Sequence, residues 1–387
     1  MRWLPTPEIL TGANALSELS PWLIDHRVSR LAIVSDHGLV LAGVIERVLS
    51  MIPETITVAV FDRVSPDPDI ALVDSAIAFA KDANVDAILG IGGGSSIDTA
   101  KLVAALAPGR QDITSILGGD PISRVPLPLM IIPTTAGTGS EVTPIAVISD
   151  QEDELKKAVV SVRLIPQRVI LDPLLTLSLP SDQTAYTGMD ALIHAIESFL
   201  SVQSNEFTEV LSLRALKLIW SSLPATYANG GDVESREALL LGSCLAGMAF
   251  ANAGVAAIHA FAYPLGGRYH LPHGLANALM LMPLMRFNLE GDGVGMKFQR
   301  MNEAVGGTVE GGASEFLDAL QHLLRRLDFP LNLASVGVRR ESLPIMAKSV
   351  MRIDRLLRNN PRKVTPDMAL RLYEEAYSGA DDADRSA

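Results

Sequence analysis

The sequence predicts an α/β domain with Rossmann-like topology followed by an all-helical domain, and two observations carry this prediction. Up to about residue 182, short β-branched runs alternate with segments of helical length, which is typical of right-handed βαβ units around a mostly parallel sheet. Beyond that point the β-branched runs disappear and long helical periodicities follow. Because 387 residues exceed the usual size of one hydrophobic core, we expect two domains, over 1–182 and 183–387.

In the first half, the predicted strands are short, rich in β-branched residues and bounded by Gly, Pro or Asp. They cover residues 30–36, 56–62, 86–92, 127–134 and 168–173. Segments long enough for helices lie between them, for example at 70–83 and 96–107. The alternation therefore predicts a mostly parallel sheet.

In the second half, helical periodicity predicts long helices. They cover residues 183–201, 206–221, 235–250 and 314–326. A last helix is expected to begin with Thr365 as N-cap and Pro366 at the first helical position, and to run to about Tyr377. Residues 238–267 carry no charge and are long enough to span a bilayer. Their glycine and polar residues, and Pro264 as the expected end of the apolar run, favour a buried helix of a soluble domain instead.

Composition limits the partners and the compartment. The formal net charge of -12 leaves no electrostatic footprint for nucleic acid, so we expect small-molecule partners and no membrane. The single cysteine, Cys244, excludes an intrachain disulfide and fits a reducing compartment. The first ten residues contain two prolines where a signal peptide needs an apolar run. We therefore expect a cytoplasmic protein.

A glycine-rich turn, "GIGGGSSIDTAK", follows the strand at 86–92 and opens a helix. Backbone N–H groups at Gly93 and Gly94, with the hydroxyl of Ser95, suit a nucleotide phosphate there, although a plain tight turn explains the glycines equally well. The turn matches neither G-x-G-x-x-G nor the Walker loop. A second turn, "PTTAGTGSEVT", offers the hydroxyls of Thr134, Thr135 and Thr138 after another strand. Two such loops at the carboxyl ends of parallel strands indicate one binding crevice.

Asp36 ends the strand "LAIVSD". A carboxylate there can bind the ribose hydroxyls of an adenosine and would repel a 2'-phosphate, which favours NAD over NADP. A capping role at the strand end is the alternative. In the common Rossmann order the acidic residue follows the glycine loop, whereas here it precedes it, so the fold is a variant.

Three of the seven histidines, His259, His270 and His273, lie in one nearly uncharged stretch. In "TGMDALIHAIE", Asp190 and His194 are four residues apart and therefore lie on one helix face. Together with His259 and His273 they would form a site of one carboxylate and three imidazoles. That donor set suits Fe(II) or Zn(II) and disfavours Mg or Ca. For each histidine alone, an ordinary core position is the alternative.

These motifs, with "DPLLTLSLP" and "NNPRKVT", resemble the iron-dependent (group III) alcohol dehydrogenase family over nearly the whole chain. The resemblance implies the fold shared with dehydroquinate synthase, and an NAD-dependent, metal-dependent interconversion of a small alcohol with its aldehyde or ketone, in a homodimer or larger homo-oligomer. It implies metal ligands at Asp190, His194, His259 and His273. The NAD contacts that it implies are Asp36, Gly93, Gly94, Ser95, Asp98, Thr134, Thr135, Thr138 and Lys157.

The chain departs from the family pattern at Tyr263. Many members similar to lactaldehyde reductase have a histidine there, thought to lie near the nicotinamide and to help move protons. Tyr263 can donate through its hydroxyl but is a weak base near neutral pH. His270 is the other candidate for the proton relay, with a plain surface position as its alternative.

Other functions remain as alternatives. A maleylacetate reductase, which works without the metal, and a glycerol dehydrogenase are both disfavoured by the complete ligand set. A lyase similar to dehydroquinate synthase needs a Lys and Arg cluster for a phosphorylated substrate, and only Arg268 is obvious. A nucleotide-binding or metal-storage protein without enzymatic activity is the remaining interpretation.

Overall fold

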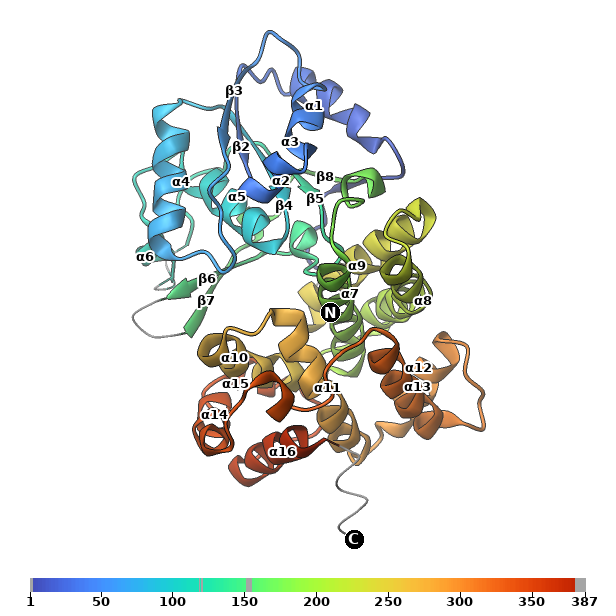
Figure 1. Ribbon diagram of the computed structural model, residues 1–387. Coiled ribbons are helices and arrows are strands. Elements are labelled where there is room, and N and C mark those ends of the chain that lie inside the picture. Colours follow the sequence, from blue (N-terminus) through green and yellow to red (C-terminus); the bar gives the residue numbers. More distant parts are fainter. Residues whose placement is uncertain (1–2, 118, 120, 151–154, 380–387) are drawn as a thin grey trace. The chain divides into compact units, whose positions relative to one another are not determined.

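The computed structural model describes residues 3–117, 119, 121–150 and 155–379, and it divides into two compact units. Unit 1 consists of Met1–Pro180 together with Gly230–Gly247. Unit 2 consists of Ser181–Asn229 and Met248–Ala387. The α/β unit and the helical unit are drawn in Figure 1.

Unit 1 is built on a parallel sheet of six strands in the order β1-β8-β5-β4-β2-β3. Their bounds are β1 Glu8–Thr11, β2 Arg30–Val34, β3 Thr57–Phe61, β4 Ala87–Gly92, β5 Leu129–Pro133 and β8 Arg168–Leu171. The five predicted strands are confirmed. β1 was not predicted, because an edge strand of four residues after two prolines carries little periodicity.

Helices cover both faces of this sheet, which explains why β4 and β5 are apolar throughout and β2 is apolar after Arg30. On one face, Leu31 and Ile33 belong to a buried cluster with Trp22 and Val48. On the other face, α5 packs on β4. The helical segments are η1 Ala15–Glu18, α1 Leu19–Asp25, α2 His37–Leu41, α3 Val44–Leu49, α4 Ile70–Asp82, α5 Gly94–Leu106, α6 Ile113–Leu117, η2 Ser140–Val142, η3 Val162–Leu164 and η4 Pro173–Leu175.

A separate two-stranded antiparallel sheet, β6 Ile145–Asp150 with β7 Leu155–Val160, was also not predicted. The pairing places Ile145 opposite Val160 and Ile148 opposite Lys157. The sequence signal is weak because Leu, Lys and Ala at the start of β7 are good helix formers. Pairing with β6 overrides that local preference.

All regular secondary structure in the described part of unit 2 is helical, as predicted. Its segments, with α9 shared between the units, are α7 Ser181–Leu200, α8 Glu206–Ala228, α9 Val233–Ala253, α10 Ala257–Tyr269, α11 His273–Leu289, α12 Gly295–Ala304, α13 Gly312–Arg326, η5 Ala334–Val336, η6 Arg340–Ser342, α14 Leu343–Val350, α15 Asp354–Leu357 and α16 Pro366–Ser378. The predicted start of α16 is confirmed, since the Thr365 side chain accepts a hydrogen bond from the Met368 N–H.

The uncharged run at 238–267 is two helices, α9 and α10, rather than one. Pro264 does not end the apolar segment, contrary to prediction, but lies inside α10, and the turn comes later, at His270. An interior proline loses one intrahelical hydrogen bond and crowds the carbonyl four residues earlier, at a cost of about 3 kcal/mol. The helix continues because burial of its neighbours Phe261 and Leu265 outweighs that cost. Among the described residues, no single helix is both long enough and apolar enough to span a membrane. Helices α9 and α10 meet these two criteria only when they are taken together, and they are bent by 105° relative to each other.

Candidate metal centre and nucleotide-binding loops

Helix α7 carries three buried ionisable side chains on one face, Asp190, His194 and Glu197. Their spacing of four and then three residues follows the helical repeat, so all three point the same way. Helix α11 packs against α7, and its second residue is Gly274. A Cβ at Gly274 would lie 1.9 Å from the Tyr186 carbonyl oxygen of α7. Only glycine permits this approach, which brings the adjacent His273 up to Asp190.

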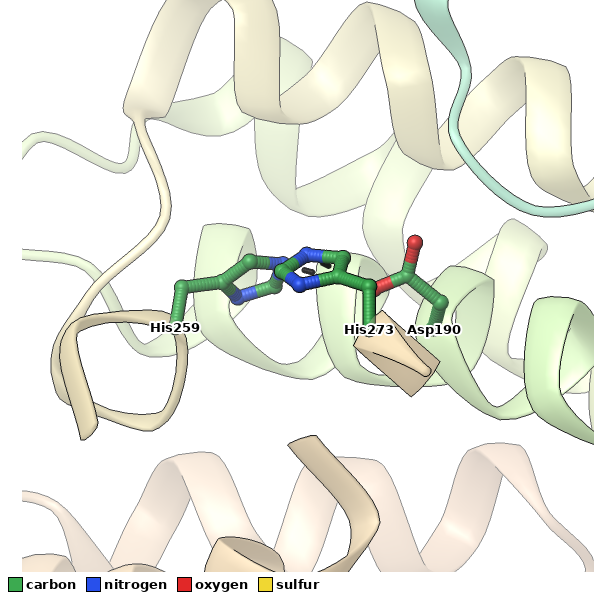
Figure 2. A group of neighbouring side chains, drawn as sticks. All are labelled: Asp190, His259 and His273. Atoms are coloured by element: carbon green, nitrogen blue, oxygen red, sulfur yellow. Dashed lines mark ion pairs between the residues drawn. The ribbon is translucent and has the colours of Figure 1, made fainter. Parts of the chain in front are cut away.

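The four predicted ligands converge in unit 2. His259 Nε2 lies 3.5 Å from Asp190 Oδ1, and His273 Nε2 lies 3.7 Å from the same oxygen (Figure 2). His194 Nε2 lies 3.9 Å from Asp190 Oδ1 and 3.0 Å from His259 Nε2. The His194 ring is held between the rings of Phe250 and His259, at 4.4 and 4.6 Å. Three separate helices, α7, α10 and α11, thus bring the ligand atoms of Asp190, His259 and His273 within 4.8 Å of one another, with His194 beside His259.

The chemistry and spacing of these donors fit a divalent transition-metal ion. A tetrahedral ion with bonds of about 2.0–2.2 Å separates its donors by about 3.3–3.6 Å, close to the distances found here. The ring of His273 is 35% exposed, whereas the other three side chains are nearly buried. His273 is therefore the member of this group that solvent reaches most.

The ionisation of the cluster also favours a cation. Burial opposes ionisation of Asp190, but the charges of His194 and His273 and the hydrogen bond with His259 outweigh it, so its pKa lies well below the usual range. Burial lowers the pKa of His259, but Glu197 and Asp190 overcome this effect and raise that pKa to about 9. The carboxylates thus stabilise positive charge at this point, and a metal ion can supply that charge in place of protons.

Asn277, one turn after His273 on α11, was missed by the sequence reasoning. Its amide nitrogen donates to Asp190 Oδ1 at 2.8 Å and lies 3.3 Å from Nε2 of both His259 and His273. Its carbonyl oxygen Oδ1 is buried and has no hydrogen-bond partner among the described residues. Its spacing of four residues from His273 was the signal available in the sequence.

Glu197 was also missed, although it ends the motif that contains Asp190 and His194. Its Oε2 lies 2.5 Å from His259 Nδ1, and its Oε1 accepts a hydrogen bond from the Ile258 N–H at 2.6 Å. The carboxylate is therefore bound to two successive residues at the start of α10.

The two candidates for proton transfer lie in different settings. Tyr263 follows His259 by one turn of α10, and its ring centre is 6.1 Å from that of His273. Burial raises the pKa of Tyr263, against a smaller opposite effect of the Arg355 charge. His270 is exposed and forms the C-cap of α10 with a left-handed backbone, φ 54°. The structure therefore favours the surface interpretation of His270.

In unit 1, the predicted nucleotide loops meet where the strand order reverses, between β2 and β4. Ligands of open α/β sheets bind at such a point. Gly92 has φ +142°, and a Cβ there would lie 2.7 Å from Ser96 Oγ and 3.3 Å from Asp36 Oδ2. The glycine turn thus lies beside Asp36 and leads into α5, whose N-cap is Gly93.

Other predicted nucleotide contacts surround this turn. The Thr134 N–H donates to the Gly92 carbonyl, and Ser95 Oγ accepts from the Asp67 N–H. Thr135 and Thr138 are half-buried and lie beside Gly93 and Gly94. Asp36 also caps α2, since its side chain accepts from the Leu39 N–H at 3.2 Å. The capping interpretation of Asp36 is thus observed, and it leaves Oδ2 facing the glycine turn.

Asp98 and Lys157 lie less favourably for contact with a nucleotide. Asp98 is buried, binds the Ser140 hydroxyl and accepts from the Val147 N–H at 2.8 Å. Lys157 is half-buried on β7. Both assignments stay predictions.

A buried ionic cluster underlies the second loop. Lys101 is fully buried and donates through Nζ to the Ser140 hydroxyl, to the Thr143 carbonyl and hydroxyl, and to the Ile145 carbonyl. Burial lowers its pKa to about 8, and burial raises the pKa of the neighbouring Glu141 to about 7. Lys101 thus ties α5 to residues 140–145, so the two loops share one support.

Comparison with known families agrees with this geometry. Residues 5–173 match the model of the iron-containing alcohol dehydrogenase family, and residues 184–377 match that of the Fe-containing alcohol dehydrogenase family, C-terminal. The two matches cover both units except for short segments.

Individual relatives match along the full length. Alcohol dehydrogenase 4 of Saccharomyces cerevisiae is 35% identical over 367 residues, covering 95% of this chain and 96% of the yeast protein. The crystal structure of a 1,3-propanediol oxidoreductase has a TM-score of 0.93 at 33% identity, covering 97% of this chain and 100% of the other. Sulfoacetaldehyde reductase from Bifidobacterium kashiwanohense, solved in complex with NAD+, has a TM-score of 0.91 at 28% identity, covering 98% and 99%.

Proposed function

The chain belongs to the iron-containing alcohol dehydrogenase family and is an oxidoreductase of alcohols and aldehydes, and on that premise we propose how its own residues serve the reaction. In this proposal Asp190, His194, His259 and His273 hold a divalent ion, iron foremost and zinc as the alternative. The loops after β2, β4 and β5 bind NAD. The observation that carries the proposal is the group formed by Asp190, His259 and His273, whose ligand atoms all lie within 4.8 Å of one another. His194 Nε2 joins this group at 3.0 Å from His259 Nε2 and 3.9 Å from Asp190 Oδ1.

When bound, a divalent cation supplies Lewis acidity toward an alcohol or carbonyl oxygen, while the nicotinamide accepts or supplies the hydride. The protein contributes by fixing donor positions before substrate arrives. His194 is held by its stacking on Phe250, and His259 by its contact with Glu197. The partly exposed His273 marks the side on which substrate enters. We therefore place the alcohol or aldehyde next to His273 and Tyr263.

Tyr263 is the proposed proton donor of the site. Since burial raises its pKa, the hydroxyl stays protonated near neutral pH and can donate to the oxygen of an aldehyde during reduction. Among the described residues it has no hydrogen-bond partner that would compete for this proton. His270 takes no part in this proposal, because its side chain is exposed at the end of α10.

The proposed NAD contacts lie at the carboxyl ends of β2, β4 and β5, where the strand order of the sheet reverses. Backbone N–H groups at Gly93, Gly94 and Ser95 suit the pyrophosphate at the start of α5. Asp36 suits the adenosine ribose hydroxyls, because its Oδ2 lies beside Gly92. The remaining proposed contacts are Asp98, Thr134, Thr135, Thr138 and Lys157.

The proposal is tested by purifying the protein without oxygen, measuring its metal content, and screening small primary alcohols and aldehydes with NAD(H). We expect turnover that is lost on treatment with a chelator and restored by Fe(II). Undiminished turnover in fully metal-free protein would contradict the metal assignment. Equal turnover with NADP(H) would contradict the assignment of Asp36.

We further propose that the enzyme is cytoplasmic and assembles as a homodimer or a larger homo-oligomer. The free thiol of Cys244 fits a reducing compartment. Two large apolar side chains, Phe207 and Val210, are 61% and 68% exposed on one face of α8, and contact with a second copy would bury them. Light scattering after size exclusion measures the assembly state, and a monomer would contradict it.

A further inference from the structure

We propose that Glu197 is a positioning residue of the metal centre, which orients His259 toward the cation and adds a second buried negative charge. This inference rests on the proposed metal-binding function of unit 2. It goes beyond that function because it assigns cation affinity to a side chain that does not itself belong to the converging donors.

The geometry of the contact leaves His259 one orientation. Glu197 and His259 are each about 2% exposed, so water does not compete for the contact. His259 Nδ1 lies 2.5 Å from Glu197 Oε2, and therefore only Nε2 remains for a metal ion. That is the nitrogen found 3.5 Å from Asp190 Oδ1 and 3.0 Å from His194 Nε2. Carboxylates that accept the second N–H of a metal-binding histidine act in this way in many metal sites.

The second oxygen of Glu197 holds the backbone on which His259 is mounted. Helix α10 begins at Ala257, and its N-cap residue, Ala256, has no side chain that can cap. The Ile258 N–H is one of the unpaired donors at this helix start, and it donates to Glu197 Oε1 at 2.6 Å. One carboxylate from α7 thus fixes both the ring of His259 and the first turn of α10.

Charge supports the same conclusion. Asp190 with three neutral imidazoles would leave a divalent ion with one uncompensated positive charge in a buried site. Glu197, which contacts His259, supplies the second negative charge. The divalent ion and the two carboxylates together then have no net charge. Since uncompensated buried charge is costly, removing Glu197 should weaken cation binding as well as helix capping.

The decisive variant is Glu197→Gln. Its carbonyl can still accept from the Ile258 N–H, so the start of α10 keeps its cap. Its amide group would donate to His259 Nδ1 and turn a protonated Nε2 toward the cation site. We expect Co²⁺ affinity, measured without oxygen by competition with a chromogenic chelator, to fall about 10–100-fold. The metal-free variant should still fold, with a melting temperature lowered by the loss of the buried Glu197–His259 ion pair.

Ser198→Ala is the matched control, because Ser198 is the next residue on α7, is equally buried, and binds Ser212 instead. It should stay within about threefold of the wild type in Co²⁺ affinity, well below the loss expected for Glu197→Gln. If Glu197→Gln does not fold, Glu197→Asp keeps the charge but shortens the reach, and its Co²⁺ affinity should also fall.

A folded Glu197→Gln or Glu197→Asp variant with wild-type Co²⁺ affinity would overturn the proposal and leave Glu197 as a helix cap only. An equal loss in Ser198→Ala would overturn it too, because the effect would then be general to buried polar groups of α7. The proposed function fails in a different way: in that case wild-type protein binds no Co²⁺, and His273→Ala makes no difference.

Discussion

At the scale of single residues, the site is explained by which atom of each side chain is free. His259 offers Nε2 because Glu197 binds Nδ1, and Asp190 stays ionised because positively charged neighbours outweigh its burial. Asp36 uses one oxygen to cap α2 and keeps the other beside Gly92. Because each of these side chains acts through a different contact, single substitutions should affect metal binding and coenzyme preference separately.

His259→Ala should abolish turnover and lower bound metal together, because it removes one of four donors. Elemental analysis and an alcohol oxidation assay on the same preparation check this. His322→Ala, which removes an exposed histidine of α13, is the control and should change neither. Loss of activity with full metal content would count against His259 as a ligand.

Tyr263→Phe should lower kcat by about 100-fold or more while metal content is kept, because a general acid contributes at least that much. Tyr227→Phe removes another half-buried tyrosine hydroxyl, one bound to Asp328, and serves as the control. Steady-state kinetics with one aldehyde and NADH measure the effect. Unchanged kcat in Tyr263→Phe would remove Tyr263 from the proton transfer.

Replacing Asp36 should increase the use of NADPH relative to NADH, because the carboxylate repels a 2'-phosphate. Asp36→Gly tests this most simply, and Asp36→Asn is sharper because Asn still caps α2. Asp69→Asn is the control, since Asp69 caps α4 in the same manner. The ratio of kcat/KM for the two coenzymes is the measurement, and an unchanged ratio in both Asp36 variants would refute the assignment.

At the scale of elements, unit 1 depends on helices that begin where strands end. α5 starts directly after β4, and Lys101 on α5 ties that helix to residues 140–145 beyond β5. In unit 2, α7 supplies Asp190, His194 and Glu197, while α10 and α11 each supply one histidine. The proposed metal site is therefore assembled from rigid helices, whereas the proposed NAD site uses the loops that follow β2, β4 and β5.

The buried cluster of α5 predicts a pH dependence of stability. Glu141 holds its proton up to about pH 7 in the folded protein but only to 4.5 when unfolded, because burial penalises its charge. Between these values the folded state binds the extra proton, so rising pH favours unfolding. The free energy of unfolding of the wild type should thus fall by roughly 2 kcal/mol relative to Glu141→Gln from about pH 5 to about pH 7.

Urea unfolding of both proteins across that range measures this difference. Glu374→Gln, at an exposed position of α16, is the control and should follow the wild type. A constant difference between wild type and Glu141→Gln would show that Glu141 is ionised alike in both states.

At the scale of the whole molecule, the proposed cofactors belong to different units. Asp36 and the glycine turn lie in unit 1, whereas Asp190, His194, His259 and His273 lie in unit 2. Each unit has its own buried core and its own set of functional side chains. Binding of one cofactor should therefore stabilise mainly the elements of its own unit.

Hydrogen exchange with mass spectrometry checks this division. NAD+ should slow exchange at the start of α5 and at residues 134–138, because these backbones would contact it. Zn²⁺ added to metal-free protein should slow exchange over 190–197 and 257–273. Protection of the glycine turn by Zn²⁺ alone, with none at α7, would contradict the assignment of the metal to unit 2.

The sequence by itself determined the features that depend on neighbours along the chain. Alternation of strands and helices, the paired positions of Asp190 and His194, the glycine turn and the Thr365 cap are all set by local periodicity and local backbone preference. For these, the structure agrees with the expectation. The exceptions are short or locally misleading: β1 has four residues, and the start of β7 favours a helix.

Only the tertiary structure decided which distant side chains meet. Glu197 and His259 are 62 residues apart, and Asp190 and Asn277 are 87 apart, so nothing in their local patterns pairs them. The burial of Asp98 under Ser140 and Val147, and the exposure of His270 at the end of α10, likewise follow from how elements pack. Packing is a property of several elements at once, and therefore no single stretch of sequence encodes it.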